Sequence, residues 1–253
     1  MYKADTIEVV FQHGWGQTPA PFKLWQTIML EEIKRHRLNV SLECRFLDRG
    51  YFNKDTSPVA QSSKSGEKSK VVIVTHSLGL HLLDSTHLLR ADLLLCLAGF
   101  VNWHRHSPAG ESLSKRLVER MLNKLKTKPE QVLNDFYERC GQTGENRPPA
   151  KEFDSCRLYE DLLLLHNAEL AEAGSLLKSG NRALVLQGQN DAFLSVRQME
   201  ELAEHLGAVL CELVPDSTHD LPNQIAVRGT ALILDFLNQA VPSPGFLART
   251  GKE

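Results

Sequence analysis

The chain has 253 residues, a formal net charge of −2, and 42% hydrophobic and 24% charged residues. This length and composition predict one large soluble domain, or one domain with an insertion, and the near-zero net charge argues against nucleic acid as a partner. Five cysteines without a C-x-x-C pair predict reduced thiols and a cytoplasmic location. No segment resembles a signal peptide or reaches membrane-spanning length, so no membrane partner is expected.

The N-terminal part begins with an apolar strand over 7–11 that leads directly into the sequence HGWG. Two glycines and a tryptophan after a strand indicate a tight, specific loop. A helix is expected over 22–36, and the alternating residues 41–47 predict a second strand. The polar segment 53–70 predicts a surface loop. His13 is a candidate catalytic residue, but a structural histidine that binds loop backbone is the favoured interpretation.

Residues 71–83, VVIVTHSLGLHLL, are the central feature of the chain. The β-branched run Val71–Val74 predicts a strand that is buried on both faces of a parallel sheet. Ser77 stands in the turn that follows, before a helical pattern, as in the nucleophile elbow G-x-S-x-G. The N–H of Leu78 would then lie at a helix N-terminus, where an oxyanion can bind. Thr75 departs from the motif, and the alternative is an ordinary serine near a helix N-cap.

The middle of the chain is helical in pattern and lacks the strand signals of the N-terminal part. After another buried strand at 93–98, the residues 103–181 contain charged amphipathic helices and no strand-like run. Helices are expected there over residues 111–126, 129–139 and 158–177. The pattern predicts a helical lid at 103–181, inserted into a core formed by 1–102 and 182–253, with the substrate pocket between lid and sheet.

Strands and helices alternate again after the predicted lid. Strands are expected over 183–187 and 208–213, and helices over 196–206 and 224–239. This alternation predicts an α/β fold with a mostly parallel sheet and helices on both faces. Chemistry in such folds gathers at the carboxyl ends of the strands, where Ser77, Asp191 and His219 all stand.

The order Ser77, Asp191, His219 is the order of an α/β-hydrolase triad. A serine hydroxyl needs a base, which His219 can supply, and Asp191 would hold the imidazole in the required tautomer. Asp191 could instead be an ordinary turn aspartate, and Asp216 and Asp220 are weaker candidates for the acid, because Asp216 suits a turn and Asp220 adjoins the histidine. This chemistry needs no metal or cofactor, and none is expected.

The HGWG loop, the HSLG elbow, the G-x-x-D turn and the late histidine resemble the α/β-hydrolase superfamily. HGWG with HSLG is most similar to the BioH-type carboxylesterases, which hydrolyse the methyl ester of pimeloyl-acyl-carrier protein in biotin synthesis. The resemblance implies a serine carboxylesterase with a small or carrier-bound acyl ester as substrate. It also implies an oxyanion hole formed by the N–H groups of Trp15 and Leu78. Thr75 and Leu80 replace glycines of the family pattern.

Other activities of the same fold remain open. A thioesterase, a lipase-like enzyme, a lyase and a non-catalytic binding protein are all compatible with this fold, because fold does not determine function. An intact set of triad residues favours a hydrolase over a protein that only binds.

A basic stripe marks the first helix of the predicted lid. Arg116, Arg120 and Lys124 are spaced four residues apart, and residues 111–128 contain six basic and two acidic side chains. Such a face could steer an acidic acyl carrier protein. Arg116, Arg120 and Arg139, together with Trp15, are candidate substrate-binding residues. The alternative for the stripe is a solvated helix face.

Overall fold

The computed structural model describes residues 6–52, 69–142, 144, 147–148, 152–170, 177 and 182–238. In this part of the chain six parallel strands form one sheet with the order β2-β1-β3-β4-β5-β6. The strands are β1 (Thr6–Gln12), β2 (Ser41–Leu47), β3 (Ser69–His76), β4 (Leu93–Leu97), β5 (Arg182–Gly188) and β6 (Leu210–Val214). Most of the predicted surface loop, residues 53–68, lies outside the described residues.

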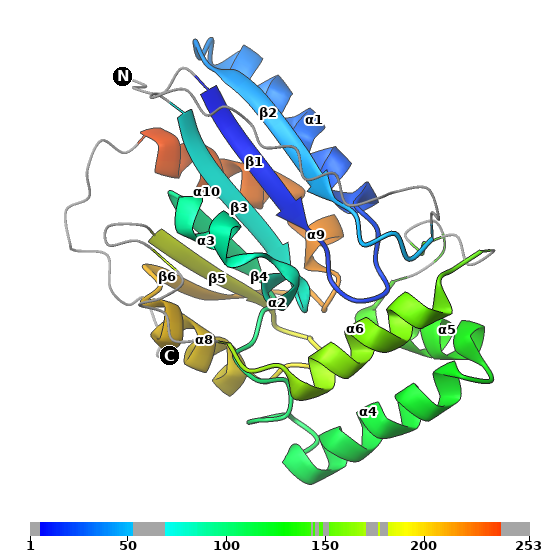
Figure 1. The fold of residues 1–253 in the computed structure, drawn as a ribbon. Coiled ribbons are helices and arrows are strands. Elements are labelled where there is room, and N and C mark those ends of the chain that lie inside the picture. The colour runs from blue at the N-terminus through cyan, green and yellow to red at the C-terminus, as the bar shows by residue number, and fades with distance from the viewer. Residues whose placement is uncertain are drawn as a thin grey trace.

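Helices cover both faces of the sheet (Figure 1). One face carries α1 (Ala20–Arg35), α9 (Leu221–Gln224) and α10 (Ala226–Asn238), and the other carries α2 (Gly79–Leu82), α3 (Ser85–Arg90) and α8 (Val196–Leu206). Successive strand side chains point to opposite faces, so Val72 and Val74 join the core on the α1 side, while Val71 and Ile73 join the core on the α8 side. Burial on both faces explains why these strands are continuously apolar.

Between β4 and β5, the described residues form the helices α4 (Glu111–Leu125), α5 (Pro129–Cys140) and α6 (Ser155–Asn167). Figure 1 shows them together at the end of the sheet to which the strand arrows point. We call α4, α5 and α6 the helical insertion. Its position places it over the carboxyl ends of the parallel strands.

The helix predicted over 158–177 is wrong at both ends. It begins at Ser155, where the Asp154 carboxylate accepts the backbone N–H of Arg157 as an N-cap. It ends at Asn167, after which Glu169 forms an isolated β-bridge with Asn102. Ala168 is extended, and the backbone N–H of Leu170 donates to the carbonyl of Val101 at 2.9 Å, so the chain leaves the helix there to pack against the core. Residues 171–176 of the predicted helix lie outside the described residues.

Two other helices are interrupted. The helix after Ser77 stops at Leu82, because Leu83 is extended and Asp84 starts a new helix by accepting the N–H of Thr86. The last predicted helix is preceded by the short α9, and the two are separated at Ile225. Apolar spacing alone does not reveal such breaks, because both parts bury the same kind of residue.

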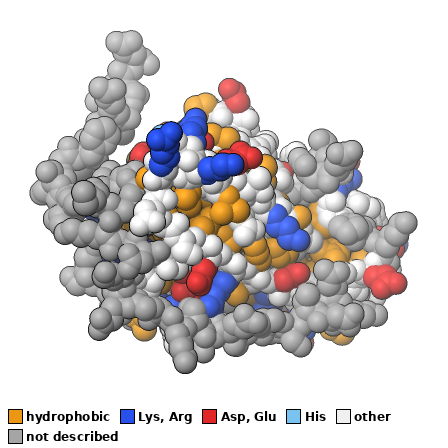
Figure 2. Space-filling model, turned by 90° about the horizontal axis from the view of Figure 1, so that it is seen from above, with side chains coloured by type: hydrophobic (Ala, Val, Ile, Leu, Met, Phe, Trp, Pro, Cys, Tyr) orange, Lys and Arg blue, Asp and Glu red, His pale blue; other side chains and the backbone are white. Residues whose placement is uncertain are grey.

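The surface carries mixed charge. On the face in Figure 2, Lys and Arg side chains lie among Asp and Glu side chains and hydrophobic ones, in keeping with the net charge of −2. Among the described residues, no helix combines the length and the apolar character needed to cross a membrane.

Candidate active site

Ser77 occupies a sharp turn directly after β3. Its backbone φ is +53°, a conformation that is uncommon for a residue with a side chain and that is found at functional sites. The backbone N–H of Ser77 donates to the carbonyl of Leu97 at 2.9 Å, which fixes the turn against β4. A Cβ at Gly79 would lie 2.6 Å from the carbonyl oxygen of Gln12, so only glycine permits this close approach of α2 to β1.

Ser77, His219 and Asp191 form one hydrogen-bonded row. The distance from His219 Nε2 to Ser77 Oγ is 3.1 Å, and from His219 Nδ1 to Asp191 Oδ2 it is 2.7 Å. The side chains of His219 and Asp191 are fully buried. The structure therefore brings together the three residues that the sequence singled out, and the geometry suits proton transfer from the serine to the imidazole.

The Asp191 carboxylate is held ionised by its surroundings. Burial alone would raise its pKa, but the charge of His219 and hydrogen bonds from the backbone N–H groups of Phe193 and Leu194 lower it below its usual value. The loop of Asp191 is also fastened to the loop of His219. The N–H of Asn190 donates to the carbonyl of Ser217 at 2.8 Å, so the two side chains keep a fixed separation.

The competing acids and histidines have other partners. Asp220 accepts hydrogen bonds from Gln142 Nε2 at 2.8 Å and from the Asn223 side chain, and burial raises its pKa. Asp216 is an exposed turn residue with a φ of +54°, as expected. His13 contacts the carbonyl of Gly14 and the backbone N–H of Arg49, which agrees with the structural role favoured from the sequence.

The HGWG loop lies directly against the nucleophile. A Cβ at Gly14 would be 2.9 Å from the carbonyl oxygen of His76 and 3.0 Å from Ser77 Cβ, so glycine allows the loop to reach the elbow. Within the described residues, the backbone N–H groups of Trp15 and Leu78 donate to no backbone carbonyl. Leu78 follows Ser77 directly, and Trp15 lines the same cavity as Ser77, so both N–H groups remain candidates for the oxyanion hole that the sequence predicts.

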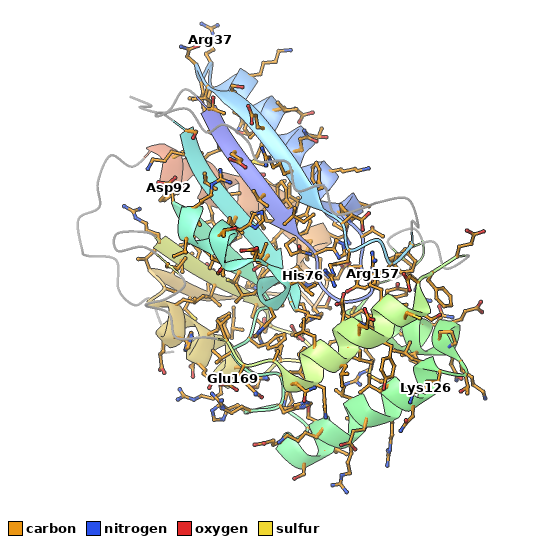
Figure 3. All side chains as sticks on the ribbon, viewed as in Figure 1. Arg37, His76, Asp92, Lys126, Arg157 and Glu169 are labelled. Carbon is orange, nitrogen blue, oxygen red and sulfur yellow. The ribbon has the colours of Figure 1, made fainter. Side chains whose placement is uncertain are left out.

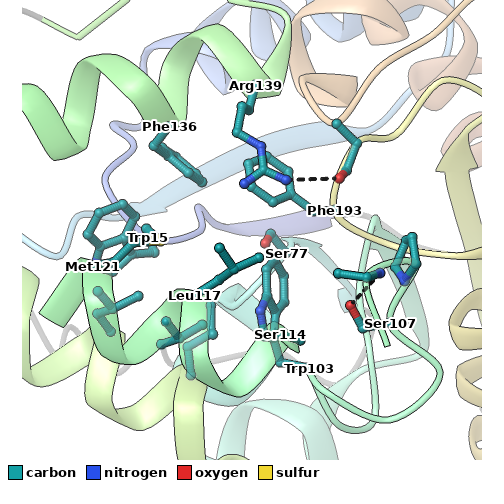
Figure 4. Close-up of a pocket in the computed structure, with 16 residues that line it drawn as sticks. Trp15, Ser77, Trp103, Ser107, Ser114, Leu117, Met121, Phe136, Arg139 and Phe193 are labelled. Atoms are coloured by element: carbon teal, nitrogen blue, oxygen red, sulfur yellow. Dashed lines mark hydrogen bonds between the residues drawn. The ribbon is translucent and has the colours of Figure 1, made fainter. Parts of the chain in front are cut away.

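A cavity of about 60 Å³ opens above Ser77, as Figure 4 shows. Its wall combines residues of the loops after β1, β4 and β5 with residues of the helical insertion. Most of the lining is apolar, including Trp15, Trp103, Phe136, Leu162 and Phe193. An apolar cavity with few polar groups is typical of a small-molecule site.

A larger groove of about 370 Å³ between α4 and α5 shares Phe136, Phe193 and Arg139 with the cavity. Arg120 and Lys124 also line this groove, and Lys124 pairs with Asp135 at 2.8 Å. The Arg139 guanidinium lies 4.8 Å from the centre of the Phe193 ring.

Arg116 belongs to neither the lining of the cavity nor that of the groove. Its Nε donates to the carbonyl of Ser112 one turn earlier, and the residue is exposed. Of the three arginines that the sequence proposed for substrate binding, the structure thus places Arg120 and Arg139 beside the site and Arg116 away from it.

Some residues at the site carry no recognisable signal in the sequence. Trp103, Phe136 and Phe193 line the cavity, but in the sequence they cannot be told from ordinary core aromatics. His76, directly before the nucleophile, also carries no such signal, yet its Nε2 lies 2.8 Å from the carbonyl oxygen of His219. Figure 3 shows His76 at the end of β3, where the sheet meets the helical insertion.

Neither a family model nor a curated protein sequence matches the chain. Several solved structures match it in fold. An esterase from Exiguobacterium antarcticum matches with a TM-score of 0.69 and 17% identity over 94% of both chains. YbtT, a type II thioesterase of the yersiniabactin pathway, matches with a TM-score of 0.58 and 15% identity over 92% of this chain and 93% of its own. A thermophilic esterase from Thermogutta terrifontis gives a TM-score of 0.60 and 16% identity over 94% and 91%.

These likenesses concern the fold. The chain has the α/β-hydrolase fold, which confirms the fold class predicted from the sequence. Because this fold carries several activities, the reaction has to be argued from the site itself.

Proposed function

We propose that the protein is a serine hydrolase that cleaves carboxylic esters through an acyl-enzyme. The observation that carries the proposal is the hydrogen-bonded row from Ser77 Oγ through His219 to the buried Asp191, with Ser77 at an apolar cavity. A serine hydroxyl is a weak nucleophile, and such a row is the arrangement that activates it. The esterases and the thioesterase of similar fold support the same class of reaction.

The residues of the site have distinct roles in this reaction. Ser77 Oγ attacks the ester carbonyl carbon while His219 Nε2 takes its proton, and the negative oxygen lies between the N–H groups of Trp15 and Leu78. His219 then gives the proton to the leaving alcohol, which leaves an acyl-serine. Water attacks this ester with His219 again as the base, and the acid and free Ser77 are released. Asp191 stabilises the imidazolium of His219 both in the formation and in the hydrolysis of the acyl-enzyme.

The Ser77→Ala variant tests the proposal. It should lower hydrolysis of a p-nitrophenyl ester by a factor of about 10⁴ or more, because the nucleophile is lost while binding remains. A fluorophosphonate probe should label the wild-type protein and leave the variant unlabelled. Ser107→Ala is the matched control, since Ser107 lines the same cavity, and it should be labelled like the wild type. Equal labelling of Ser77→Ala and wild type would contradict the assignment.

The substrate that we propose is an acyl group carried by an acidic acyl carrier protein. The groove between α4 and α5 supports this, because Arg120, Lys124 and Arg139 line it next to the cavity. Basic side chains at the mouth of a site can steer an acidic protein. The sequence resemblance favours a methyl ester such as that of the pimeloyl group in biotin synthesis, and a carrier-bound thioester is the second candidate, which the type II thioesterase of similar fold supports.

Comparing the rates of hydrolysis of a pimeloyl methyl ester and of a pimeloyl thioester on the same carrier would separate the two candidate substrates.

We also propose a cytoplasmic location for this activity. All five cysteines are free thiols, which is the usual state in a reducing compartment.

A further inference from the structure

A second polar row ends at the wall of the cavity. Ser114, on the first turn of α4, lines the cavity and is only 4% exposed. Its Oγ lies 2.8 Å from His104 Nδ1, and His104 Nε2 lies 3.1 Å from His166 Nδ1. His104 follows β4 and His166 is on α6, so the row joins the core to two helices of the insertion. The ester reaction described above uses none of these three side chains.

The two hydrogen bonds of His104 fix who donates in the row: if one ring nitrogen donates its proton, the other must accept one. His104 is buried, and burial, followed by the charge of His166, lowers its pKa, so its ring is neutral and carries one N–H. When His104 Nδ1 donates to Ser114, the hydroxyl proton of Ser114 is free to point into the cavity. When Ser114 donates to His104, its oxygen lone pairs face the cavity. Both arrangements satisfy the two hydrogen bonds, because a neutral imidazole can carry its N–H on either ring nitrogen.

The hydroxyl of Ser114 is therefore a polar group that can donate or accept in a mostly apolar wall. Figure 4 shows it on the same side of the cavity as Trp103, beside the apolar Leu117. Burying the His104 imidazole and the Ser114 hydroxyl costs free energy that an apolar wall would not require. A site that hydrogen-bonds a substrate oxygen discriminates against the analogue that lacks it, because its own polar group is then left without a partner.

We propose that Ser114, positioned by His104 and His166, selects acyl chains that carry an oxygen substituent, either a hydroxyl or an oxo group. This inference rests on the proposed ester hydrolysis. The acyl part is assigned to Ser114 because Ser114 lines the same cavity as Ser77, to which the acyl group is bonded in the acyl-enzyme, whereas Arg120 and Lys124 line only the groove, where the carrier would lie.

The test compares methyl hexanoate with methyl hexanoates that carry a hydroxyl or an oxo group at successive carbons. The wild type should prefer at least one oxygenated ester by about tenfold in kcat/KM, since one buried hydrogen bond is made or missed. Ser114→Ala should abolish this preference, mainly by raising KM for the oxygenated ester. Ser114→Thr keeps the hydroxyl and should keep the preference. Ser107→Ala, at the same cavity but outside the row, should also keep it.

Several outcomes would overturn the proposal. Equal loss on plain and oxygenated esters in Ser114→Ala would mean that Ser114 only holds α4 in place. A wild type without preference, or a preference seen only when the alcohol part of the ester carries the oxygen, would remove the acyl assignment.

Binding to the Ser77→Ala protein separates this inference from the proposed reaction. There the oxygenated ester should bind about tenfold more tightly than methyl hexanoate, and the added Ser114→Ala change should equalise the two. Failure of hydrolysis with this binding preference intact would contradict only the proposed reaction. Equal binding of both esters to Ser77→Ala would contradict the role of Ser114.

Discussion

At the scale of single residues, the residue before the nucleophile positions the base. His76 is 3% exposed, and its Nε2 donates to the carbonyl oxygen of His219 at 2.8 Å. Burial, and next the charge of His219, lower the pKa of His76 to about 3, so the ring is neutral and can donate from Nε2 throughout the working pH range. The elbow therefore supplies both the nucleophile and a hydrogen bond to the backbone of its base.

His76→Phe should lower kcat about tenfold with little change in KM, because the base is less well placed while the cavity keeps its lining. His76→Gln retains an N–H donor and should recover part of the loss. Steady-state kinetics on a small ester, together with a melting curve, would check this. If both variants lost activity equally and only in proportion to a fall in Tm, His76 would be a packing residue alone.

At the scale of elements, the helical insertion is fastened to the oxyanion loop. Trp15 Nε1 donates to the carbonyl of Leu158 on α6 at 2.7 Å, and the Tyr137 hydroxyl on α5 donates to the carbonyl of Gly16 at 2.7 Å. The buried Asp161 on α6 also accepts from Arg49 and from Tyr51 of the core. The insertion therefore both lines the cavity and holds the loop that would supply one oxyanion donor.

Arg120→Glu on α4 should raise KM for a carrier-bound ester by about three- to tenfold at low salt, because it reverses a charge in the groove. The effect should shrink at high salt, since exposed charges are screened. Hydrolysis of a small free ester should not change. Arg116→Glu is the matched control: it makes the same charge change on the same helix, but outside the groove. If the two variants raised KM equally, the cause would be the overall electrostatic potential of the protein and not a charge in the groove. If neither variant changed KM, the support for a carrier protein would be lost.

At the scale of the whole molecule, loops from distant parts of the chain meet over the sheet and bury carboxylates with opposite effects on stability. The pKa of Asp191 is lowered, so this group stabilises the fold above its unfolded pKa of about 3.9 and loses that contribution as the pH falls through its folded pKa. The pKa of Asp220 is raised by burial, so its favourable contribution is present below about 3.9 and is lost as the pH rises through its folded pKa.

Asp220→Asn should therefore stabilise the protein at neutral pH by about 2 °C in Tm, because the amide carries no charge and its oxygen can still accept from Gln142. The gain should shrink as the pH falls through the raised folded-state pKa of Asp220, because the wild-type carboxyl is then protonated in the fold. Melting curves across this pH range measure it. Asp216→Asn, an exposed aspartate in the same loop, is the control. A gain that was the same at every pH would contradict the titration of Asp220 as its cause.

The sequence by itself determined the parallel sheet and the chain order of Ser77, Asp191 and His219. Buried parallel strands are continuously apolar, and the residues that follow them meet at one edge, so local patterns were sufficient. The helix over 196–206 was predicted with its observed bounds for the same reason, since its capping box and apolar stripe are local.

Only the tertiary structure decided which residues surround the site. Trp15 and Leu158 are 143 positions apart, and His104 and His166 are 62 apart, yet each pair is hydrogen-bonded. The same packing separates Arg120, which faces the groove, from Arg116, although both belong to one regular stripe. Such contacts depend on how the insertion packs against the sheet, and this packing is fixed by many apolar contacts between distant segments, which local spacing does not encode.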